Sequence, residues 1–409
     1  MIAGSAVIAG VDVGSTKTCA VIAESPPGRE AGDPLGVIGV GVSPAGGMNG
    51  PAITNLEAAT TSVRQALQEA ERMSGREADG VFISVPSAYV ETSRSRGVVA
   101  VSGAEITPTH VRRVQEVGQA VPVPPDRQLI HAICQEYSVD GRGGIQDPVG
   151  MMATRLEADV SVVTADSAAC RDLAKAVDRA GYRAEEFVIA PLASGLSLLD
   201  DGDRDAGVAL IEIGGASTDV LVYGGKRMLH VATMPWGGSA ITRDVARGLG
   251  VPEDEACRLK ENHGSARRSA VDPEEQLEVS GPSLGAGRRV SRELLAHIIE
   301  QRLDEILGLV YDELEEAGVR DRLGAGIVLA GGGVCTPQTV ELARSVFNLP
   351  VRLGVPGSGL SGATNAVATP VYATGVGLAM YGSLQRRSGS LAGATRAIAR
   401  VGGWIRDFF

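Results

Sequence analysis

The first 86 residues alternate between short apolar runs and turn-rich segments. Each apolar run is seven to nine residues long and rich in Val, Ile and Ala, which is typical of buried strands. The first three runs follow one another with only turns between them, so they predict an antiparallel meander. The predicted strands in this part of the chain are 6–12, 18–24, 35–43 and 80–86.

Ahead of the fourth strand, apolar residues recur every three or four positions. This period places them on one face of a helix, which predicts a helix over 56–73. Asn55 stands just before it and is the predicted N-cap. The apolar residues on the predicted buried face are Leu56, Ala59, Val63, Leu67 and Ala70.

The opening pattern returns in the second half of the chain. Residues 207–215, 218–225 and 226–235 again follow the order strand, glycine turn, strand, turn, strand. The first turns match: DVGSTKT at 12–18 and EIGGASTD at 212–219 each have an acidic residue, then glycine, then hydroxyl side chains. These matches predict a distant internal duplication and two facing lobes of similar topology. Two unrelated hairpins are the simpler alternative.

The remaining apolar patterns complete an α/β protein. A strand at 157–166 leads into a helix at 167–180, which Gly181 is expected to end. Farther on, a strand at 326–334 runs into three glycines before another helix begins at about 337. Long helices are predicted in addition at 291–317 and 370–383.

Two stretches break the alternation of strands and helices. Residues 87–156 are richer in Pro, Gly and charged residues, and the segments 122–126 and 141–150 are expected to interrupt any long element. This stretch is predicted to be a small inserted subdomain. The segment 264–290 is polar and rich in Gly, Pro and Ser, which predicts a loop with short strands, and residues 386–394 are linker-like.

The composition narrows the classes of function. A chain of 409 residues suggests two domains or one two-lobed unit. The net charge of −11 and a pI near 5.1 argue against general nucleic-acid binding, which needs a basic face. The five cysteines lie far apart without a CxxC pair, so neither a disulfide framework nor a zinc site is expected, and a reducing cytoplasm fits best. No apolar run approaches the roughly 18 residues that span a bilayer.

The glycine–hydroxyl turns predict an anion site. Such turns direct several backbone N–H groups at one point, and glycine lets a phosphate group approach the backbone closely. Lys17, which taken alone would be an ordinary surface lysine, adds a positive charge, and Asp12 is placed to hold Mg²⁺ through water. The glycines at 331–333 are expected to lie against a nucleoside. The chain has neither a GxxxxGK[ST] P-loop nor a GxGxxG that opens a βαβ unit.

These segments together carry a resemblance to known proteins. GVDVGSTKT, IEIGGASTD and VLAGGGV resemble the phosphate-1, phosphate-2 and adenosine motifs of the actin, Hsp70 and sugar-kinase superfamily. More narrowly, essentially the whole chain resembles the FtsA family of bacterial cell-division proteins. The narrower likeness rests on QEYSVDG (135–141), IQDPVGM (145–151), GIVLAGGG (326–333), TPVYATGVGLAMYG (369–382) and the aromatic C-terminal segment.

The resemblance implies an actin-like α/β fold of two lobes built from duplicated ribonuclease-H-like domains. In this family one subdomain of actin is missing and a differently placed subdomain, 1C, is inserted instead. Residues 87–156 match subdomain 1C in position. The other implied boundaries are 1–86, 157–192 and 365–385 for lobe 1 (subdomain 1A), 193–364 for lobe 2 (subdomain 2A, with 2B at about 236–300), 386–393 for a linker and 394–409 for an amphipathic helix.

The family binds ATP with Mg²⁺, and its binding residues can be carried over by position. Asp12 would serve both the metal and phosphate 1, and Lys260, on a helix at 253–262, would lie near the adenine and ribose. No catalytic residue is implied. The implied residues are Asp12, Gly14, Ser15, Thr16 and Lys17 for phosphate 1, Gly214, Gly215, Ala216 and Ser217 for phosphate 2, and Gly331, Gly332 and Gly333 with Lys260 for the nucleoside.

Two departures from the wider superfamily concern hydrolysis. Hydrolytic members often place a Glu before Pro in an EPxAA-like stretch, where it orients the attacking water, whereas VIAPLASG has Ala190 at that place. Asp is common where Glu212 stands in the phosphate-2 motif. We therefore expect the nucleotide to act as a structural and polymerisation switch, with hydrolysis slow or absent.

The C-terminal residues form a candidate membrane anchor. Aromatic residues make up only 3% of the chain, yet three of them fall within VGGWIRDFF. On a helix over 394–409 the apolar residues share one face and the other face is largely basic, which is typical of a helix in an anionic membrane interface. A helix docked on its own domain is the alternative. The residues expected to enter the membrane are Ile398, Val401, Trp404, Ile405, Phe408 and Phe409.

These features predict an ATP-binding, filament-forming actin homologue with at most weak ATPase activity. By resemblance, it would tether filaments of the tubulin-like FtsZ to the cytoplasmic face of the inner membrane at the division septum, as a peripheral protein. It would also help recruit later division proteins through subdomain 1C. A PilM-like platform for pilus assembly is the alternative within this fold. A small-molecule kinase is the alternative from another class, and it leaves the tail unexplained.

Overall fold

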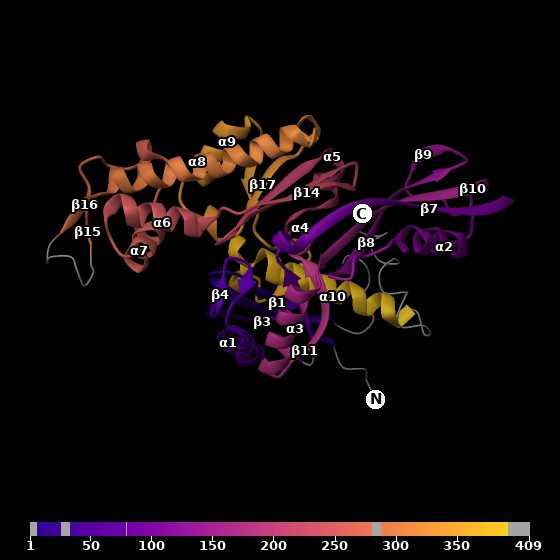
Figure 1. The fold of residues 1–409 in the computed structure, drawn as a ribbon, viewed down its shortest axis with the longest axis horizontal. Helices are drawn as coiled ribbons and strands as arrows, with labels where there is room; N and C mark the ends of the chain where they lie inside the picture. The colour runs from indigo at the N-terminus through magenta and orange to yellow at the C-terminus, as the bar shows by residue number, and fades with distance from the viewer. Residues whose placement is uncertain (1–5, 26–32, 79, 280–287, 392–409) are drawn as a thin grey trace.

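The computed structural model describes residues 6–25, 33–78, 80–279 and 288–391 of the chain. Figure 1 shows two sheet-and-helix lobes, one above the other, and an elongated inserted subdomain that projects to one side. Most of the first lobe and the insert come from the N-terminal half of the chain, and the second lobe comes from the C-terminal half, after which the chain returns to the first lobe with β19 (Leu360–Gly362) and α10 (Ala373–Leu391).

The first lobe is built on a mixed six-stranded sheet. Its strands, in spatial order, are β11 (Arg183–Ile189), β6 (Gly80–Val85), β1 (Ala6–Val13), β2 (Lys17–Ser25), β3 (Leu35–Pro44) and β19 (Leu360–Gly362). The strands β1, β2 and β3 form the predicted antiparallel meander, and β6 pairs in parallel with β1. The prediction for this part of the chain is confirmed.

The second lobe repeats this arrangement. Its strands, in spatial order, are β18 (Val351–Leu353), β17 (Gly326–Ala330), β12 (Val208–Ile213), β13 (Thr218–Gly224) and β14 (Arg227–Met234). Here too the first three strands along the chain are antiparallel neighbours, and the next two strands add in parallel beyond the first. Strand for strand, the order and the directions equal those of β11, β6, β1, β2 and β3 in the first lobe. The predicted internal duplication is confirmed.

Helices cover both faces of each sheet, so the strands are buried on both sides. In the first lobe, α1 (Leu56–Ser74) and α3 (Ser167–Ala180) share a core with Ala9 and Val11 of β1. The predicted caps hold: Asn55 Oδ1 accepts hydrogen bonds from the N–H groups that open α1, and Gly181 ends α3 in the left-handed conformation.

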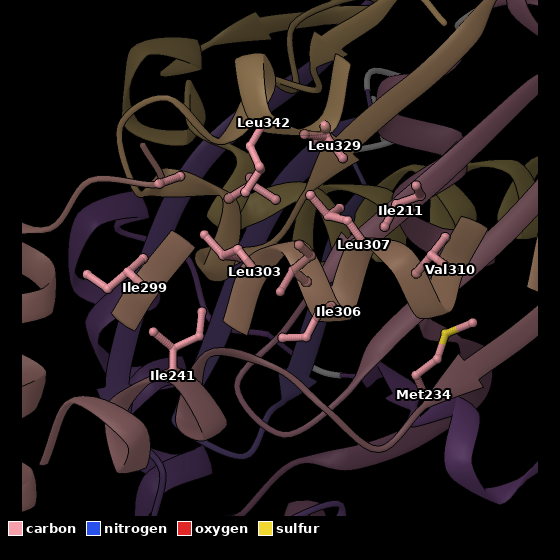
Figure 2. Close-up of a cluster of buried hydrophobic side chains, with 14 of the residues drawn as sticks. Ile211, Met234, Ile241, Ile299, Leu303, Ile306, Leu307, Val310, Leu329 and Leu342 are labelled. Atoms are coloured by element: carbon pink, nitrogen blue, oxygen red, sulfur yellow. The ribbon is translucent and has the colours of Figure 1, made fainter. Parts of the chain in front are cut away.

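The core of the second lobe is organised by one long helix, α8 (Arg292–Glu316). Figure 2 shows its apolar side chains, Leu303 and Leu307 among them, directed at the sheet residues Ile211 and Leu329. The helix α9 (Thr339–Phe347) packs beside α8 and contributes Leu342 to the same core.

Two further helices join the lobes. After β11 the chain enters α4 (Ala190–Leu198), and after the strands of the second lobe it enters α10 (Ala373–Leu391). These two helices pack on each other, and they share one core with residues from both sheets. The approach is so close that a Cβ atom at Gly377 would lie 1.7 Å from the carbonyl oxygen of Ala193. The lobes are therefore held together through a crossing of α4 and α10.

The inserted subdomain contains the longest strands of the described chain. A four-stranded sheet carries one helix on one face; its elements are β7 (Val90–Glu105), α2 (Pro108–Gln119), β8 (Arg127–Val139), β9 (Arg142–Ile145) and β10 (Met152–Asp166). The segments 122–126 and 141–150 separate the long elements of this stretch, as predicted, and the second of them contains the short strand β9. The sequence did not predict the long strands β7 and β8. The boundary proposed after residue 156 lies inside β10, which runs through it as one strand.

The second lobe carries a smaller helical part at its far end. It comprises α6 (Gly238–Leu249), α7 (Glu253–His263) and the short hairpin of β15 (Gln276–Glu278) and β16 (Arg289–Ser291). The short strands predicted within 264–290 are thus present.

The end of the chain differs from the sequence-based expectation. The helix α10 continues to Leu391, so the segment predicted as a linker from residue 386 is helical over most of its length. Arg386 contributes to this extension, because its guanidinium donates hydrogen bonds to the Val7 carbonyl oxygen (2.7 Å) and to Glu185 (3.2 Å). The predicted membrane helix at 394–409 lies outside the described residues. Within those residues, no helix is long and apolar enough to cross a membrane.

Candidate nucleotide site

A cleft of about 730 Å³ lies between the two lobes. The two duplicated turns form one end of it, and the glycine-rich segment after β17 and the helix α7 form the other. A cleft of this size matches the volumes of small-molecule and cofactor sites, which are concave and lie between domains.

The duplicated turns have the same backbone geometry. The Gly14 N–H donates to the Lys17 carbonyl oxygen at 3.0 Å, and the Gly214 N–H donates to the Ser217 carbonyl oxygen at 2.9 Å. Gly215 brings the turns together across the cleft, since a Cβ atom there would lie 2.5 Å from Thr16 Cγ2. Two hydrogen-bonded glycine turns therefore meet at one point, one from each lobe.

Lys17 supplies the positive charge at this point. Its Nζ donates to the Val371 carbonyl oxygen at 2.8 Å and lies 5.4 Å from the centre of the Tyr372 ring. Among the described residues it forms no ion pair with a carboxylate. A half-buried ammonium held by a carbonyl and a ring is well suited to an anionic ligand.

Asp12 ends β1 at the base of the first turn. Its Oδ1 accepts a hydrogen bond from Ser84 Oγ at 2.7 Å. Burial raises the pKa of Asp12, while the Ser84 hydrogen bond and the Lys17 charge oppose the rise. Nowhere in the described ranges do three or more His, Cys, Asp or Glu residues gather to hold a metal ion directly. A single carboxylate such as Asp12 at the base of an anion-binding turn fits a hydrated Mg²⁺, which keeps several waters and takes other ligands from phosphates.

Glu212 occupies the equivalent place at the end of β12, and it is tied to both crossing helices. Its carboxylate accepts hydrogen bonds from Ser194 Oγ of α4 (2.5 Å) and Thr374 Oγ1 of α10 (2.8 Å). Burial raises the pKa of Glu212 to about 7. The hydrogen bond from Ser194 lowers this pKa, whereas the negative charges of Asp12 and Asp219 raise it further. This carboxylate therefore changes charge near neutral pH.

Asp219 lies opposite Glu212 on the neighbouring strand β13. Burial raises the pKa of Asp219 to about 6, the hydroxyls of Thr233 and Ser87 lower it, and the charge of Asp12 raises it. Three buried carboxyl groups thus lie close together: Asp12 and Glu212 line the cleft, and Asp219 pairs with Glu212 on β13. Each makes the ionisation of its neighbours harder.

The wall opposite the turns comes from α7. Lys260 Nζ donates to Thr242 Oγ1 (2.9 Å) and to the Gly238 carbonyl oxygen (3.2 Å), which holds the side chain along α6. Cys257 lies on the same wall. The other acidic residues of α7 that line the cleft are Glu253, Asp254 and Glu261.

The glycines after β17 pack against the phosphate-2 strand. Gly331 has a φ of +84°, and a Cβ atom on it would lie 2.5 Å from the Ile213 carbonyl oxygen. At Gly332, in contrast, a Cβ atom would meet no atom within 4 Å, because this residue faces the open cleft. A flat ring can therefore approach the backbone here.

The structure gathers almost all of the residues that the sequence assigns to nucleotide. Every one of them lines the cleft except Ala216 and Ser217, whose backbone belongs to the second turn. Sequence reasoning missed the neighbours of Glu212 and the contribution of Val371. The sequence alone gives little indication of the contacts to Glu212, because Ser194 and Thr374 lie 18 and 162 residues away from it in the chain.

The duplicated sheets, the crossing helices and the cleft between the lobes define an actin-like protein. Comparison with family models agrees: residues 209–377 match the model described as cell division protein FtsA, and residues 87–164 match the SHS2 domain inserted in FtsA. The chain belongs to the FtsA family of cell division proteins.

Curated relatives cover nearly the whole chain. The FtsA of Pseudomonas aeruginosa is 36% identical over 387 residues, which cover 94% of this chain and 91% of the relative. The FtsA of Neisseria meningitidis is 33% identical, with 98% of both chains covered, and that of Escherichia coli strain K12 is 33% identical, with 98% and 96% covered.

Solved structures share the fold at low sequence identity. A PilM-PilN type IV pilus biogenesis complex superposes with a TM-score of 0.62 at 16% identity and covers 92% of this chain and 98% of that one. MreB5 of Spiroplasma citri bound to AMPPNP gives a TM-score of 0.56 at 13% identity, with 94% and 98% covered. At these identities the likeness concerns the fold alone.

Proposed function

We propose that this protein binds ATP with Mg²⁺ in the interlobe cleft, polymerises, and tethers FtsZ filaments to the cytoplasmic face of the cell membrane at the division septum. The observation that carries the proposal is the meeting of two equally hydrogen-bonded glycine turns, one from each lobe, beside Lys17. The family to which the chain belongs supports the role in cell division.

The residues of the cleft fit a nucleotide. The two turns and Lys17 would hold the phosphates, and the glycines at 331–333 would lie against the nucleoside. Asp12 would hold Mg²⁺ through water, and the metal would neutralise phosphate charge beside the three buried carboxyl groups. The structure of MreB5 with AMPPNP adds support from a protein of the same fold.

Two other residues, Ala190 and Glu212, favour slow ATP hydrolysis or none. At the start of α4, where the wider superfamily often has a glutamate, the side chain of Ala190 can neither accept a proton nor orient water. Glu212, close by, has both of its oxygens engaged by hydroxyls of the crossing helices. We infer that bound nucleotide sets the relation of the lobes rather than driving turnover. Phosphate release at the rate of an efficient kinase would refute this point.

The membrane step is assigned to residues 394–409. One short amphipathic helix binds a membrane weakly, and a filament multiplies that binding because it presents many copies together. The anchor would take an anionic lipid surface, lobe 2 at about 236–300 would contact FtsZ, and the insert would receive later division proteins. Because α10 extends to Leu391, only a few residues would separate the end of this helix from the anchor at 394–409.

Co-sedimentation with anionic lipid vesicles and FtsZ tests the proposal. With ATP and Mg²⁺, the full chain should bring FtsZ down with the vesicles. Deletion of 394–409 should abolish pelleting of both proteins while ATP binding is unchanged. If the truncated chain still pellets FtsZ with the vesicles, the membrane role of the tail is wrong.

A further inference from the structure

A second hollow lies where the inserted subdomain meets the second lobe. It has a volume of about 350 Å³ and shares no residue with the nucleotide cleft. The strands β7, β8 and β10 of the insert form one side. The strand β14 and Arg322, which closes the turn before β17, form the other. A ligand here would touch two parts of the molecule that belong to different lobes of the fold.

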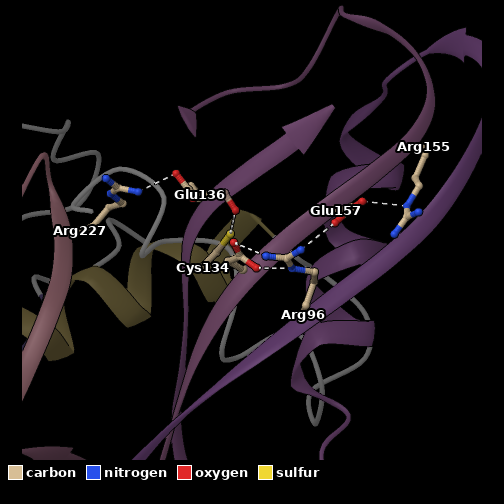
Figure 3. Close-up of polar contacts among 7 residues, drawn as sticks. Arg96, Cys134, Glu136, Arg155, Glu157 and Arg227 are labelled. Atoms are coloured by element: carbon tan, nitrogen blue, oxygen red, sulfur yellow. Dashed lines mark hydrogen bonds and ion pairs between the residues drawn. The ribbon is translucent and has the colours of Figure 1, made fainter. Parts of the chain in front are cut away.

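The two acidic residues of this hollow are already neutralised. Glu136 pairs with Arg227 across the junction at 2.7 Å. Asp159 receives two hydrogen bonds from the Arg96 guanidinium, at 2.7 and 3.3 Å. Figure 3 shows the Arg227–Glu136 pair, and beside it Arg96 directed at Glu157 on the sheet of the insert. The lining carboxylates therefore offer no free negative charge.

Two arginines remain without such partners. Arg94 comes from the insert and Arg322 from the second lobe, both are exposed, and both line the hollow. Across the described ranges, neither forms an ion pair or a side-chain hydrogen bond. Four arginines against two carboxylates leave a positive excess here, although the chain as a whole carries a net charge of −11. Arginines with open donors that converge on one hollow suit the binding of carboxylate or phosphate oxygens.

The rest of the lining distinguishes between ligands. Met228, Leu229 and Val160 contribute apolar surface between the arginines, and Gln135 accepts a hydrogen bond from the Met228 N–H at 2.8 Å. A largely polar hollow that also offers this apolar surface suits a ligand with an acidic group and a neighbouring apolar group, which a single inorganic ion lacks. This lining matches a peptide better than a free phosphate.

We propose that this hollow binds a short acidic peptide segment of a partner protein. A carboxylate of the segment bridges Arg94 and Arg322, and a neighbouring apolar side chain lies on Met228 and Leu229. Because the bridge joins the insert to the second lobe, the occupied site clamps the two parts. The Arg227–Glu136 pair and the Gln135 contact hold this junction when no peptide is bound.

Peptide selection tests this assignment. A phage library of random heptapeptides is panned on the immobilised full chain, and the recovered sequences are measured as fluorescent peptides by anisotropy. The recovered peptides should be rich in Asp and Glu next to apolar residues. The double variant R94E/R322E should weaken their binding by about tenfold or more, because it replaces two attractive charges by two repulsive ones.

The control is R113E, which makes one such charge reversal on the exposed face of α2 in the same subdomain and should leave binding unchanged. Unfolding curves establish that each variant is folded, and R94Q/R322Q replaces the double reversal if that variant is not. Peptides without an acidic preference, no enrichment, or binding that survives the double variant would overturn the proposal. Displacement of the peptides by inorganic phosphate at equal ionic strength, but not by chloride, would assign the hollow to a phosphate ligand and overturn it equally.

Discussion

The two lobes share one framework but differ in what they attach to it. Both sheets have the same strand order, and both turns close with the same backbone hydrogen bond. In the first lobe the inserted subdomain interrupts the chain between β6 and α3, whereas in the second lobe the helical part follows β14. Since insertions fall between strands, the sheets and the cleft between them are preserved.

The chemistry of the two turns differs more than their geometry. Lys17 closes the first turn and Ser217 occupies the matching place in the second, so only the first turn carries a positively charged side chain. On the neighbouring strand of the first lobe, Cys19 lies opposite Asp12. In the second lobe Asp219 lies opposite Glu212, so only the second lobe has a pair of acidic residues at this place. The first lobe thus contributes attraction to an anion, and the second contributes backbone donors and buried carboxyl groups.

The largest effect is expected where the lobes are joined. In Gly377→Ala, the new methyl group would meet the backbone of α4 at Ala193, so the crossing helices must separate. We expect a loss of about 3 kcal/mol in the free energy of unfolding, measured with urea. The control Gly308→Ala, on α8 with no atom within 4 Å of the new methyl, should be neutral or slightly stabilising. Equal stability of the two variants would show that the crossing is not tightly packed.

The next largest effect concerns the buried carboxyl of the second lobe. The pKa of Glu212 is raised to about 7 from 4.5, so the folded protein holds this proton more tightly than the unfolded chain does. Stability from this group is complete below pH 4.5 and is lost as the pH rises through 7. Glu212→Gln should therefore be up to about 3 kcal/mol more stable than the wild type at pH 8, and this advantage should shrink to about 1 kcal/mol at pH 5.

Urea unfolding of both proteins at the two pH values measures this difference. The hydroxyls of Ser194 and Thr374 can still bond to the amide of Gln, so the substitution keeps the local packing. A variant that is less stable than the wild type at pH 8 would contradict the account.

The contrast between the turns predicts unequal effects on ATP binding. Lys17→Ala should weaken binding about tenfold to a hundredfold, because a charge-assisted contact to phosphate is worth about 1.5–3 kcal/mol. Ser217→Ala should change the affinity only by about twofold, since the second turn acts through its backbone. Isothermal titration calorimetry compares the variants. Similar losses at both positions would mean that the lobes contribute alike.

The smallest effect is expected at the end of α10. Arg386→Ala removes the hydrogen bond to Val7 and the half-exposed ion pair with Glu185, which should lower the free energy of unfolding by about 1 kcal/mol. Vesicle pelleting by the full chain should persist, because the anchor itself is intact. Loss of pelleting at full stability would show that the direction of α10 matters for membrane binding.

Local patterns predicted most of the fold. The strands and helices of both lobes follow from apolar spacing, and the caps at Asn55 and Gly181 follow from residue type. The duplicated turns also predicted most of the cleft, because each turn is a contiguous stretch of sequence. The sequence did not predict that the two turns contact each other, because Gly215 and Thr16 come together only when the two lobes pack.

Two elements that the sequence did not predict, β7 and the end of α10, have a common physical cause. The first half of β7 consists mainly of exposed polar residues, Arg94 and Arg96 among them, and pairing with β10 along nearly its whole length stabilises the strand. Likewise, α10 passes residue 386 because Arg386 finds partners on β1 and β11. In both cases contacts between distant segments outweigh weak local propensity.

Hydrogen–deuterium exchange tests the central claim that both lobes hold one nucleotide. Exchange of the full chain is followed by mass spectrometry with and without ATP and Mg²⁺, in peptides that cover the turns at 13–17 and 213–217. Bound nucleotide should slow exchange in both turns together and in the glycines at 331–333. Protection confined to one lobe, or absent from both turns, would contradict this claim.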